Sequence, residues 1–472
     1  MRVLLVNPPS ANEIVSCNPK FLNEERGYTP PLGILYLASY VKKFSDFEVQ
    51  VLDCQAEKVS YADLPHIIEI KRPDVIGITA MTFTLIDALK FIEIVKKINP
   101  QIIIVLGGPH PHIYPEETIN FSGIDYVILG EGEKTFLELL KCLDKKDYER
   151  LRQVKGLVFK MDGQIINTGP GEPIMNLDEL PFPARKLTPY KNYYSIIAKK
   201  NPITTMFTSR GCPYRCTFCD RPAMGKLFRA RSAKNVVAEM EECQKMGIKE
   251  IFIYDDTFTV NRQRVIDICQ EIQKRKLEIF WDIRARVDTV DENVLKELKK
   301  AGCQRIHYGV EAGTEKILKV LNKGITLKQA EEAFKLTKKI GMKTLAYFIL
   351  GSPGETKEDI LETINFAQKL NPEFVQFTLL TPFPATLIYL DGLKRGIFKY
   401  DHWKQFAASP SLGFKTKYWE ENLSEEELIS LLNLAYRSFY LKPSFIVKEI
   451  FRIRSLSELK KKIKTGLRIL FG

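Results

Sequence analysis

The stretch Gly211-Cys212-Pro213-Tyr214-Arg215-Cys216-Thr217-Phe218-Cys219-Asp220 places three cysteines within ten residues, in the spacing Cys-x3-Cys-x2-Cys. Three thiolates so close together on one loop can converge on a metal centre. An iron–sulfur cluster held by four cysteines usually only carries electrons. A cluster held by three cysteines leaves one iron open to a small-molecule ligand. Structural zinc sites usually take four ligands in two pairs, and the sequence shows no second pair. The loop therefore favours a cluster over zinc and over three unconnected thiols.

Six strand candidates follow one another from about residue 200, separated by helical patterns such as 233–245 and 327–339. The candidates are residues 203–208, 250–254, 279–284, 305–310, 344–350 and 374–380. This rhythm predicts a curved parallel sheet or partial (β/α)6 barrel. Active sites in barrels of this kind lie at the carboxyl ends of the strands. The cysteine loop directly follows the first strand, so we expect it on that face.

Residues 1–140 show a second βαβ rhythm. Short apolar runs at residues 2–6, 48–52, 75–79, 102–106 and 126–129 predict an open, doubly wound parallel sheet, Rossmann-like in form. Ligands on such sheets bind at the carboxyl ends of the strands. None of these ends carries Gly-x-Gly-x-x-Gly or a Walker loop, which excludes the usual dinucleotide and P-loop nucleotide sites.

The fold class is therefore α/β, with four predicted parts. Residues 1–140 form the first domain, and residues 141–195 form a hairpin around Met161-Asp162-Gly163 followed by a proline-rich linker. Residues 196–395 form the partial barrel. Residues 396–472 form a helical C-terminal domain, in which Ser424 is expected to cap a helix.

Composition narrows the setting of the protein. The nine cysteines are an odd number without a disulfide pattern, and no signal peptide is visible, so we expect a reducing cytoplasm. Much of the net charge of +12 is local: residues 441–472 hold nine Lys and Arg against two Glu. We therefore expect no nucleic-acid partner. The basic tail fits a solvated helical cap or peripheral adsorption to an anionic membrane surface.

The cysteine loop, with Phe218 before the last cysteine, resembles the signature of radical S-adenosylmethionine (SAM) enzymes. The N-terminal half is similar to the cobalamin-binding domain of one large subfamily, which includes radical methylases and the anaerobic magnesium-protoporphyrin ester cyclase. The resemblance spans roughly residues 1–390. It implies that Cys212, Cys216 and Cys219 hold a [4Fe–4S] cluster whose open iron chelates SAM. Reductive cleavage would then yield a 5′-deoxyadenosyl radical, with electrons from a donor such as ferredoxin or flavodoxin.

The resemblance also implies SAM contacts at the strand ends. The candidates are Phe218, Asp255, Asp256, Arg284, Glu311, Gly351 and Pro353. The aspartates would hold the methionine amino group, or would instead cap the next helix. Glu311 would accept the ribose hydroxyls, and the glycine turn would approach the adenine. Arg284 or Arg286 would meet the SAM carboxylate, bind substrate or pair with Asp288.

For cobalamin the resemblance implies a larger set of contacts at the ends of the first sheet. These are Asn7, Pro8, Thr79, Thr82, Gly107, Gly108, His110, Gly130, Glu131 and Gly132. The loop Asp53-Cys54-Gln55-Ala56-Glu57 lacks the histidine of the Asp-x-His-x-x-Gly motif that supplies a lower ligand in many cobalamin proteins. Either the lower face of cobalamin carries no protein ligand, or His110 or His112 supplies one. The alternative for these two histidines is that they are simply polar surface residues of a loop.

We expect methylation of an unactivated carbon in a hydrophobic or lipid-like small molecule. One alternative is radical oxidation, cyclisation or C–C bond formation on a lipid or tetrapyrrole without net methylation. Another is a non-catalytic cobalamin-binding sensor, which the complete cysteine triad disfavours. No acid–base catalytic residue is identified from the sequence.

Overall fold

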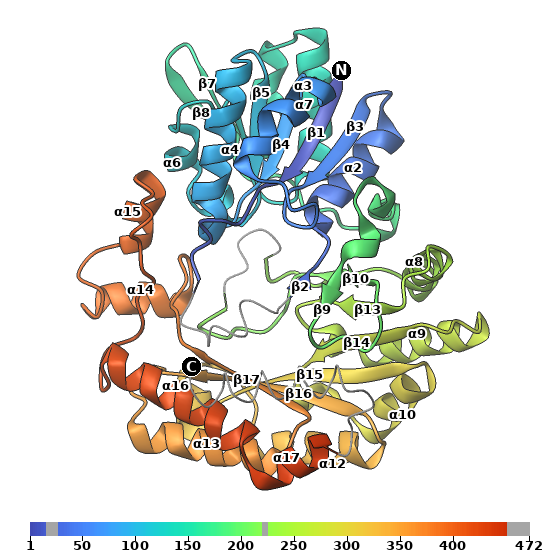
Figure 1. Ribbon diagram of the computed structural model, residues 1–472, viewed down its shortest axis with the longest axis vertical. Helices are drawn as coiled ribbons and strands as arrows, with labels where there is room; N and C mark the ends of the chain where they lie inside the picture. Colours follow the sequence, from blue (N-terminus) through green and yellow to red (C-terminus); the bar gives the residue numbers. More distant parts are fainter. Residues whose placement is uncertain (16–26, 220–224, 451–472) are drawn as a thin grey trace.

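The computed structural model describes residues 1–15, 27–219 and 225–450. Two α/β units lie one above the other, and the C-terminal helices run along one side of both (Figure 1). The basic tail beyond residue 450 lies outside the described residues. Within the described part of the chain, no helix is both long and apolar enough to cross a membrane.

The first unit is a seven-stranded sheet in the order β3-β1-β4-β5-β6-β7-β8. Its strands are β1 (Arg2–Asn7), β3 (Glu48–Asp53), β4 (Val75–Thr79), β5 (Ile103–Gly107), β6 (Tyr126–Ile128), β7 (Leu157–Met161) and β8 (Gln164–Asn167). The first five are parallel, which confirms the predicted doubly wound sheet. The predicted hairpin is β7–β8, and it extends the same sheet by pairing antiparallel with β6.

Alternation along these strands sends apolar side chains to both faces. On one face they pack on α2 (Leu32–Phe44) and α7 (Gly132–Lys145). On the other face they pack on α3 (Leu64–Lys71), α4 (Leu85–Ile98) and the short α6 (Pro115–Ile119), next to α5 (Pro109–Ile113). Helices on both faces leave the carboxyl edge of the sheet as the open side, directed at the second unit (Figure 1).

The proline-rich linker joins the two units through contacts rather than as a free tether. The backbone N–H of Ala184 donates to the carbonyl of Leu35 in α2, at 3.1 Å. The next residue, Arg185, is buried and forms an ion pair of 2.5 Å with Glu239 of the second unit. The linker therefore fixes the second unit to the first.

The second unit is a six-stranded, wholly parallel sheet in the order β10-β13-β14-β15-β16-β17. Its strands are β10 (Ile203–Met206), β13 (Glu250–Ile253), β14 (Phe280–Ala285), β15 (Cys303–Glu311), β16 (Lys343–Leu350) and β17 (Phe374–Leu379). The helices between them are α8 (Ala233–Lys245), α9 (Arg262–Lys274), α10 (Glu292–Lys300), α11 (Glu315–Val320), α12 (Leu327–Lys339) and α13 (Lys357–Leu370). The first and last strands do not pair, so the predicted partial barrel is confirmed.

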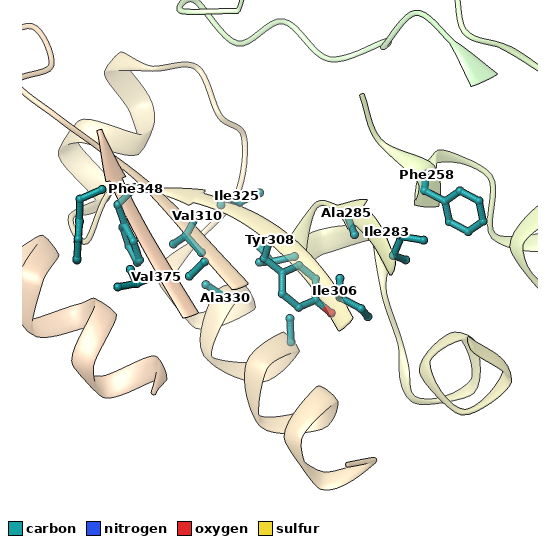
Figure 2. Packing of buried hydrophobic residues seen from close by; sticks show 14 of the residues in the cluster. Phe258, Ile283, Ala285, Ile306, Tyr308, Val310, Ile325, Ala330, Phe348 and Val375 are labelled. Atoms are coloured by element: carbon teal, nitrogen blue, oxygen red, sulfur yellow. The ribbon is translucent and has the colours of Figure 1, made fainter. Parts of the chain in front are cut away.

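The two faces of this sheet differ in chemistry. Ile283, Ala285, Ile306, Tyr308 and Val310 belong to the apolar core between the sheet and the outer helices (Figure 2). The residues that alternate with them therefore point to the concave face. That face carries charged and hydroxyl side chains, and it opens at the strand ends toward the first unit.

The C-terminal helices are α14 (Leu387–Lys394), α15 (His402–Ala408), α16 (Glu425–Tyr440) and α17 (Pro443–Ile450). Ser424 caps α16 by accepting from the N–H of Glu427, as predicted. The α14–α15 segment connects the units, because the ring of Trp403 lies 6.0 Å from that of Phe83 in the first unit. Phe83 also meets Phe383, which follows β17, with 5.4 Å between ring centroids.

The turn after β15 is packed so closely that adding a methyl group at Gly313 should lower the stability of the protein. A Cβ at Gly313 would overlap Cα of Thr363 in α13 and lie 2.8 Å from its backbone nitrogen. Backbone cannot move aside as a flexible side chain can, so Gly313→Ala should cost about 1–3 kcal/mol of stability. Gly413→Ala is the control, since nothing lies within 4 Å of its Cβ position. Urea unfolding followed by circular dichroism measures both; equal midpoints would contradict the prediction.

Candidate functional site

The cysteine loop is closed at its base by two short antiparallel strands, β11 (Ser209–Arg210) and β12 (Arg229–Ala230). Gly211 follows β11 with φ +80°, and a Cβ there would overlap the carbonyl of Leu227. Only glycine fits this close crossing of the two stems. The loop thus leaves the barrel rim from a narrow, rigid base.

The loop also contacts the barrel on one side and α14 on the other. The N–H of Thr217 donates to the carbonyl of Leu321 at 3.0 Å, and its carbonyl accepts from the N–H of Ile388 at 3.1 Å. The side-chain amide of Asn322 donates to the carbonyl of Arg215 at 2.8 Å. Backbone groups around the cysteines are thereby held from two directions.

The cysteines differ in exposure: Cys212 is buried, Cys216 half-buried and Cys219 exposed. Burial raises the pKa of the Cys216 thiol, while the nearby cations Lys323 and Arg286 act in the opposite direction. Cys212 also lies near enough to influence Cys216 electrostatically. Among the described residues, no three His, Cys, Asp or Glu side chains converge on a single ion position.

A buried ion pair lies beside the cysteines. Lys323 Nζ is 2.6 Å from Oε1 of Glu311, and both side chains are buried. Glu311 has φ +74°, at an irregularity where β15 pairs with β16. A Cβ on Gly309 would lie 2.8 Å from Lys323 Nζ, so this glycine makes room for the pair. A strained glutamate held by a buried lysine is typical of a functional site.

Lys323 was missed by the sequence reasoning. It lies in the turn after α11, and only the fold brings it to Glu311 and Cys216. Its ammonium is 6.0 Å from the ring of Phe218, so three expected site residues surround it.

The aspartate pair divides into two roles. Asp255 is wholly buried and accepts four hydrogen bonds of 2.5–3.1 Å from the N–H and hydroxyl groups of Thr208 and Ser209. Its carboxylate thus fixes the segment before β11. Contact of Asp255 with SAM stays a prediction. Asp256 is exposed and lines the cavity between the units.

The glycine turn after β16 is held by a buried glutamate. Glu355 accepts from the N–H groups of Gly351 and Ser352 at 2.6 and 2.7 Å. Burial raises its pKa to about 7. Gly351, at φ +83°, and Pro353 are both buried in this turn. The turn is therefore rigid before any ligand arrives.

The two arginines at the end of β14 and just after it, Arg284 and Arg286, also differ. Arg286 forms two 2.9 Å hydrogen bonds with Asp288, and its guanidinium lies 3.9 Å from the ring centre of Tyr214 in the cysteine loop. Arg284 instead lies over the ring of Tyr254 at 4.1 Å. Of the two arginines, Arg286 is therefore the one that pairs with Asp288.

The first unit carries a cavity of about 350 Å³ at the carboxyl edge of its sheet, between the strands, α2 and α7. Six of the expected cobalamin contacts line it: Thr79, Gly107, Gly108, Gly130, Glu131 and Gly132. No atom lies within 4 Å of the Cβ position at Gly33 or Gly130. These glycines leave an open slot with mostly apolar walls at the strand ends. Phe207, Arg210 and Asp256 extend the wall into the second unit.

Four expected cobalamin contacts lie outside this cavity wall: Asn7, Pro8, Thr82 and His110. Asn7 donates to Asp53, and the carbonyl of Pro8 accepts from Gln55. His110 is buried against Thr82 at 3.1 Å, and burial lowers its pKa to about 4. Contact of these four residues with cobalamin stays a prediction.

One carboxylate joins the cavity to the cysteine loop. Glu131 Oε2 is 2.9 Å from Arg210, and Oε1 pairs with Arg229, so it binds both stems of the loop. Arg210 also pairs with Glu133 at 2.5 Å. All four side chains are buried. Glu131 therefore acts on the cysteine loop as well as lining the cavity.

Comparison with known proteins agrees with this geometry. Residues 206–367 match the family model of the radical SAM superfamily, and residues 21–140 match that of the B12 binding domain. An uncharacterized methyltransferase of Pyrococcus horikoshii is 37% identical, over 100% of this chain and 99% of the relative. The anaerobic magnesium-protoporphyrin IX monomethyl ester cyclase of Rubrivivax gelatinosus is 30% identical, over 90% and 76%.

Among solved structures, the cobalamin-dependent S-adenosylmethionine radical enzyme OxsB, with aqua-cobalamin and SAM bound, superposes with a TM-score of 0.75. It is 20% identical, and the match covers 99% of this chain and 71% of OxsB. This likeness confirms the two-unit fold.

The bridge at Glu131 predicts a large effect from a small change. Glu131→Gln leaves two buried guanidinium groups without full compensation, which should cost about 3–5 kcal/mol. We also expect reconstituted protein to hold less iron, because both loop stems lose their anchor. Glu138→Gln in α7 is the control: its partners Lys141 and Arg150 are partly exposed, so the loss should stay below about 1 kcal/mol. Equal unfolding midpoints for the two variants would refute the bridge.

Glu355 predicts a pH dependence. Its folded pKa is raised from 4.5 to about 7, so the folded state binds more protons than the unfolded chain between these values. Stability from this group therefore falls as pH rises from 5 to 8, by about 3 kcal/mol. Glu355→Gln should lose less stability over that range than wild type. Glu362→Gln, an exposed glutamate of α13, should follow wild type. Parallel stability–pH curves for Glu355→Gln and wild type would contradict the prediction.

Proposed function

The chain belongs to the radical SAM enzymes that carry a B12-binding domain, and we propose that it transfers a methyl group to an unactivated carbon of a hydrophobic or lipid-like small molecule. The observation that carries this proposal is the shared wall of the two sites. Arg210 lines the cavity of the first unit and stands two residues before Cys212. A substrate at this junction would meet both cofactors.

The relatives support the same chemistry. The Pyrococcus horikoshii protein that matches end to end is named a methyltransferase. A hopanoid C-3 methylase of Methylococcus capsulatus is 26% identical over 75% of this chain, and it is named for a lipid substrate. We extend both names to this chain as a proposal for reaction and substrate class.

The cofactors would be held by residues of both units. We propose Cys212, Cys216 and Cys219 as ligands of a [4Fe–4S] cluster, and the glycines of the cavity as the cradle of cobalamin. When bound, the cluster with SAM supplies a 5′-deoxyadenosyl radical, and cobalamin supplies the methyl group. The protein's part is to position these groups and exclude water. A small electron carrier such as ferredoxin or flavodoxin would supply the electrons.

At the barrel rim, Lys323 can exchange its partner. Its ammonium is paired with Glu311 at 2.6 Å, next to Cys216. If the SAM carboxylate takes this ammonium, Glu311 regains lone pairs that can accept ribose hydroxyl protons. Asp256 is placed to receive the methionine ammonium, and the turn at Gly351 and Pro353 to receive the adenine. Phe218 packs the cysteine loop against this group.

Anaerobic reconstitution with cobalamin, followed by dithionite and SAM, tests the proposal. We expect both 5′-deoxyadenosine and S-adenosylhomocysteine from wild type, and neither product above background from the triple variant with Cys212, Cys216 and Cys219 changed to alanine. Cys269→Ala, a buried cysteine of α9, is the matched control and should keep both products.

Two results would change the assignment. Formation of 5′-deoxyadenosine without S-adenosylhomocysteine would contradict methyl transfer and favour the cyclase-like chemistry of the Rubrivivax gelatinosus relative. Absence of both products from wild-type protein that holds cluster and cobalamin would favour a sensor.

A further inference from the structure

The concave face of the half-barrel has a closed, neutralised floor. Arg305 is 2.6 Å from Asp282, and Asp282 also meets the imidazole of His307 at 3.1 Å. The other ring nitrogen of His307 meets the hydroxyl of Tyr347 at 2.9 Å. Nearby Glu250 accepts from the backbone N–H groups of residues 199 and 200. The charges and hydrogen-bonding groups of the floor are therefore paired with one another.

Arg284 follows Asp282 by two residues on β14 and is opposite His307 in the strand register. Ile283 and Ala285 enter the apolar core on the convex side, so Arg284 points into the concave side (Figure 2). Its guanidinium stacks on Tyr254 at 4.1 Å, and it forms no ion pair or hydrogen bond with any residue in the described ranges. The nearest carboxylate on its own strand, Asp282, is already shared by Arg305 and His307.

Further polar groups without protein partners lie on the same concave face. Within the described ranges, the hydroxyl of Tyr254 and the amide of Gln376 make no hydrogen bond to the protein, and both side chains are half-buried. Gln376 is opposite Tyr347 in the strand register, and its neighbour Phe377 points into the convex core. A guanidinium, a phenol and an amide without hydrogen-bond partners among the described residues thus lie on the concave face of the sheet.

We propose that Arg284, with Tyr254 and Gln376, binds a carboxylate or phosphate group of the substrate inside the half-barrel. A planar guanidinium offers two parallel donors to such a group, and the phenol and amide add further donors. The inference rests on the proposed function and narrows its substrate class to anionic small molecules.

Depth distinguishes this site from the SAM carboxylate site. Arg286 is level with the cysteine loop, because its guanidinium contacts Tyr214. Arg284 precedes it by two residues on the same face, which places it about 7 Å deeper. The cations near Cys216 are Lys323 and Arg286, so the rim already has its own groups for SAM. Arg284 remains for a different anion.

The test uses the holoenzyme with cluster, cobalamin and SAM bound, so that the cofactor sites are filled. Fluorine NMR line broadening measures binding of trifluoroacetate, a carboxylate probe, and of monofluorophosphate, a phosphate probe. We expect wild type to bind at least one of them, and Arg284→Met to raise its dissociation constant at least tenfold. Arg284→Lys should keep part of the affinity. Arg275→Met, which removes a surface arginine paired with Glu241 and Glu271, should match wild type.

The pattern of binding identifies the substrate group: broadening of trifluoroacetate alone indicates a carboxylate, and of monofluorophosphate alone a phosphate. The inference is overturned if neither probe binds wild type, or if Arg284→Met binds as wild type does. It is also overturned if the dissociation constant of SAM rises as much as that of the anion, since Arg284 would then belong to the SAM site.

Should Arg284→Met fail to fold, Arg284→Lys and Tyr254→Phe give the same comparison, and each is expected to lose about threefold or more in affinity for the anion. Failure of wild type to form 5′-deoxyadenosine would reject the proposed function without affecting the anion measurement.

Discussion

The buried carboxylate of Glu131 is the constraint on which the two-unit arrangement depends. It stands directly before α7, where the helix N-terminus favours a negative charge. Its two oxygens bind Arg210 and Arg229, the two stems of the cysteine loop. Buried charges of this kind are costly unless all partners are in place. Glu131 therefore ties both stems of the cysteine loop to the edge of the cavity in the first unit.

Repeating patterns in the chain were sufficient to predict both sheets. Strands buried on both faces read as apolar runs, and the segments between them have helical length, so the parallel order of each sheet follows from simple rules. The open edges of the second sheet also followed from the count of six strand–helix units. The hairpin at β7–β8 was predicted as an element, but its pairing with β6 depends on a sheet edge that local patterns do not reveal.

Site residues could be predicted from the sequence only where they belong to a short local motif. The cysteine spacing is local, and the glycines at Gly107 and Gly130 stand at strand ends that the pattern already located. Asp255 shows the limit: the strand-end position predicts a ligand contact, but it does not reveal the four donors from Thr208 and Ser209 that bind its carboxylate in the fold. Lys323 shows the opposite case, a site residue that the sequence does not reveal. Nothing in the turn after α11 distinguishes this lysine, and only the fold brings it to Glu311 of β15. Long-range partners of charged residues are set by tertiary packing, which spacing does not encode.

The charged groups of the half-barrel lie at three depths, and they differ in how each charge is compensated. At the floor, Arg305 and Asp282 are closed in by neighbours on every side, and exchange of either partner would leave a buried charge alone. At the rim, Lys323 and Arg286 each hold one carboxylate beside the cysteines, and a ligand carboxylate that took Lys323 would leave Glu311 to be compensated by other donors. Between them Arg284 has only an aromatic face, which compensates its charge weakly. A ligand anion would gain most in this middle layer, because it need not displace any carboxylate. The half-barrel thus places, between two levels of ion pairs, a guanidinium on β14 that contacts an aromatic ring and no carboxylate among the described residues.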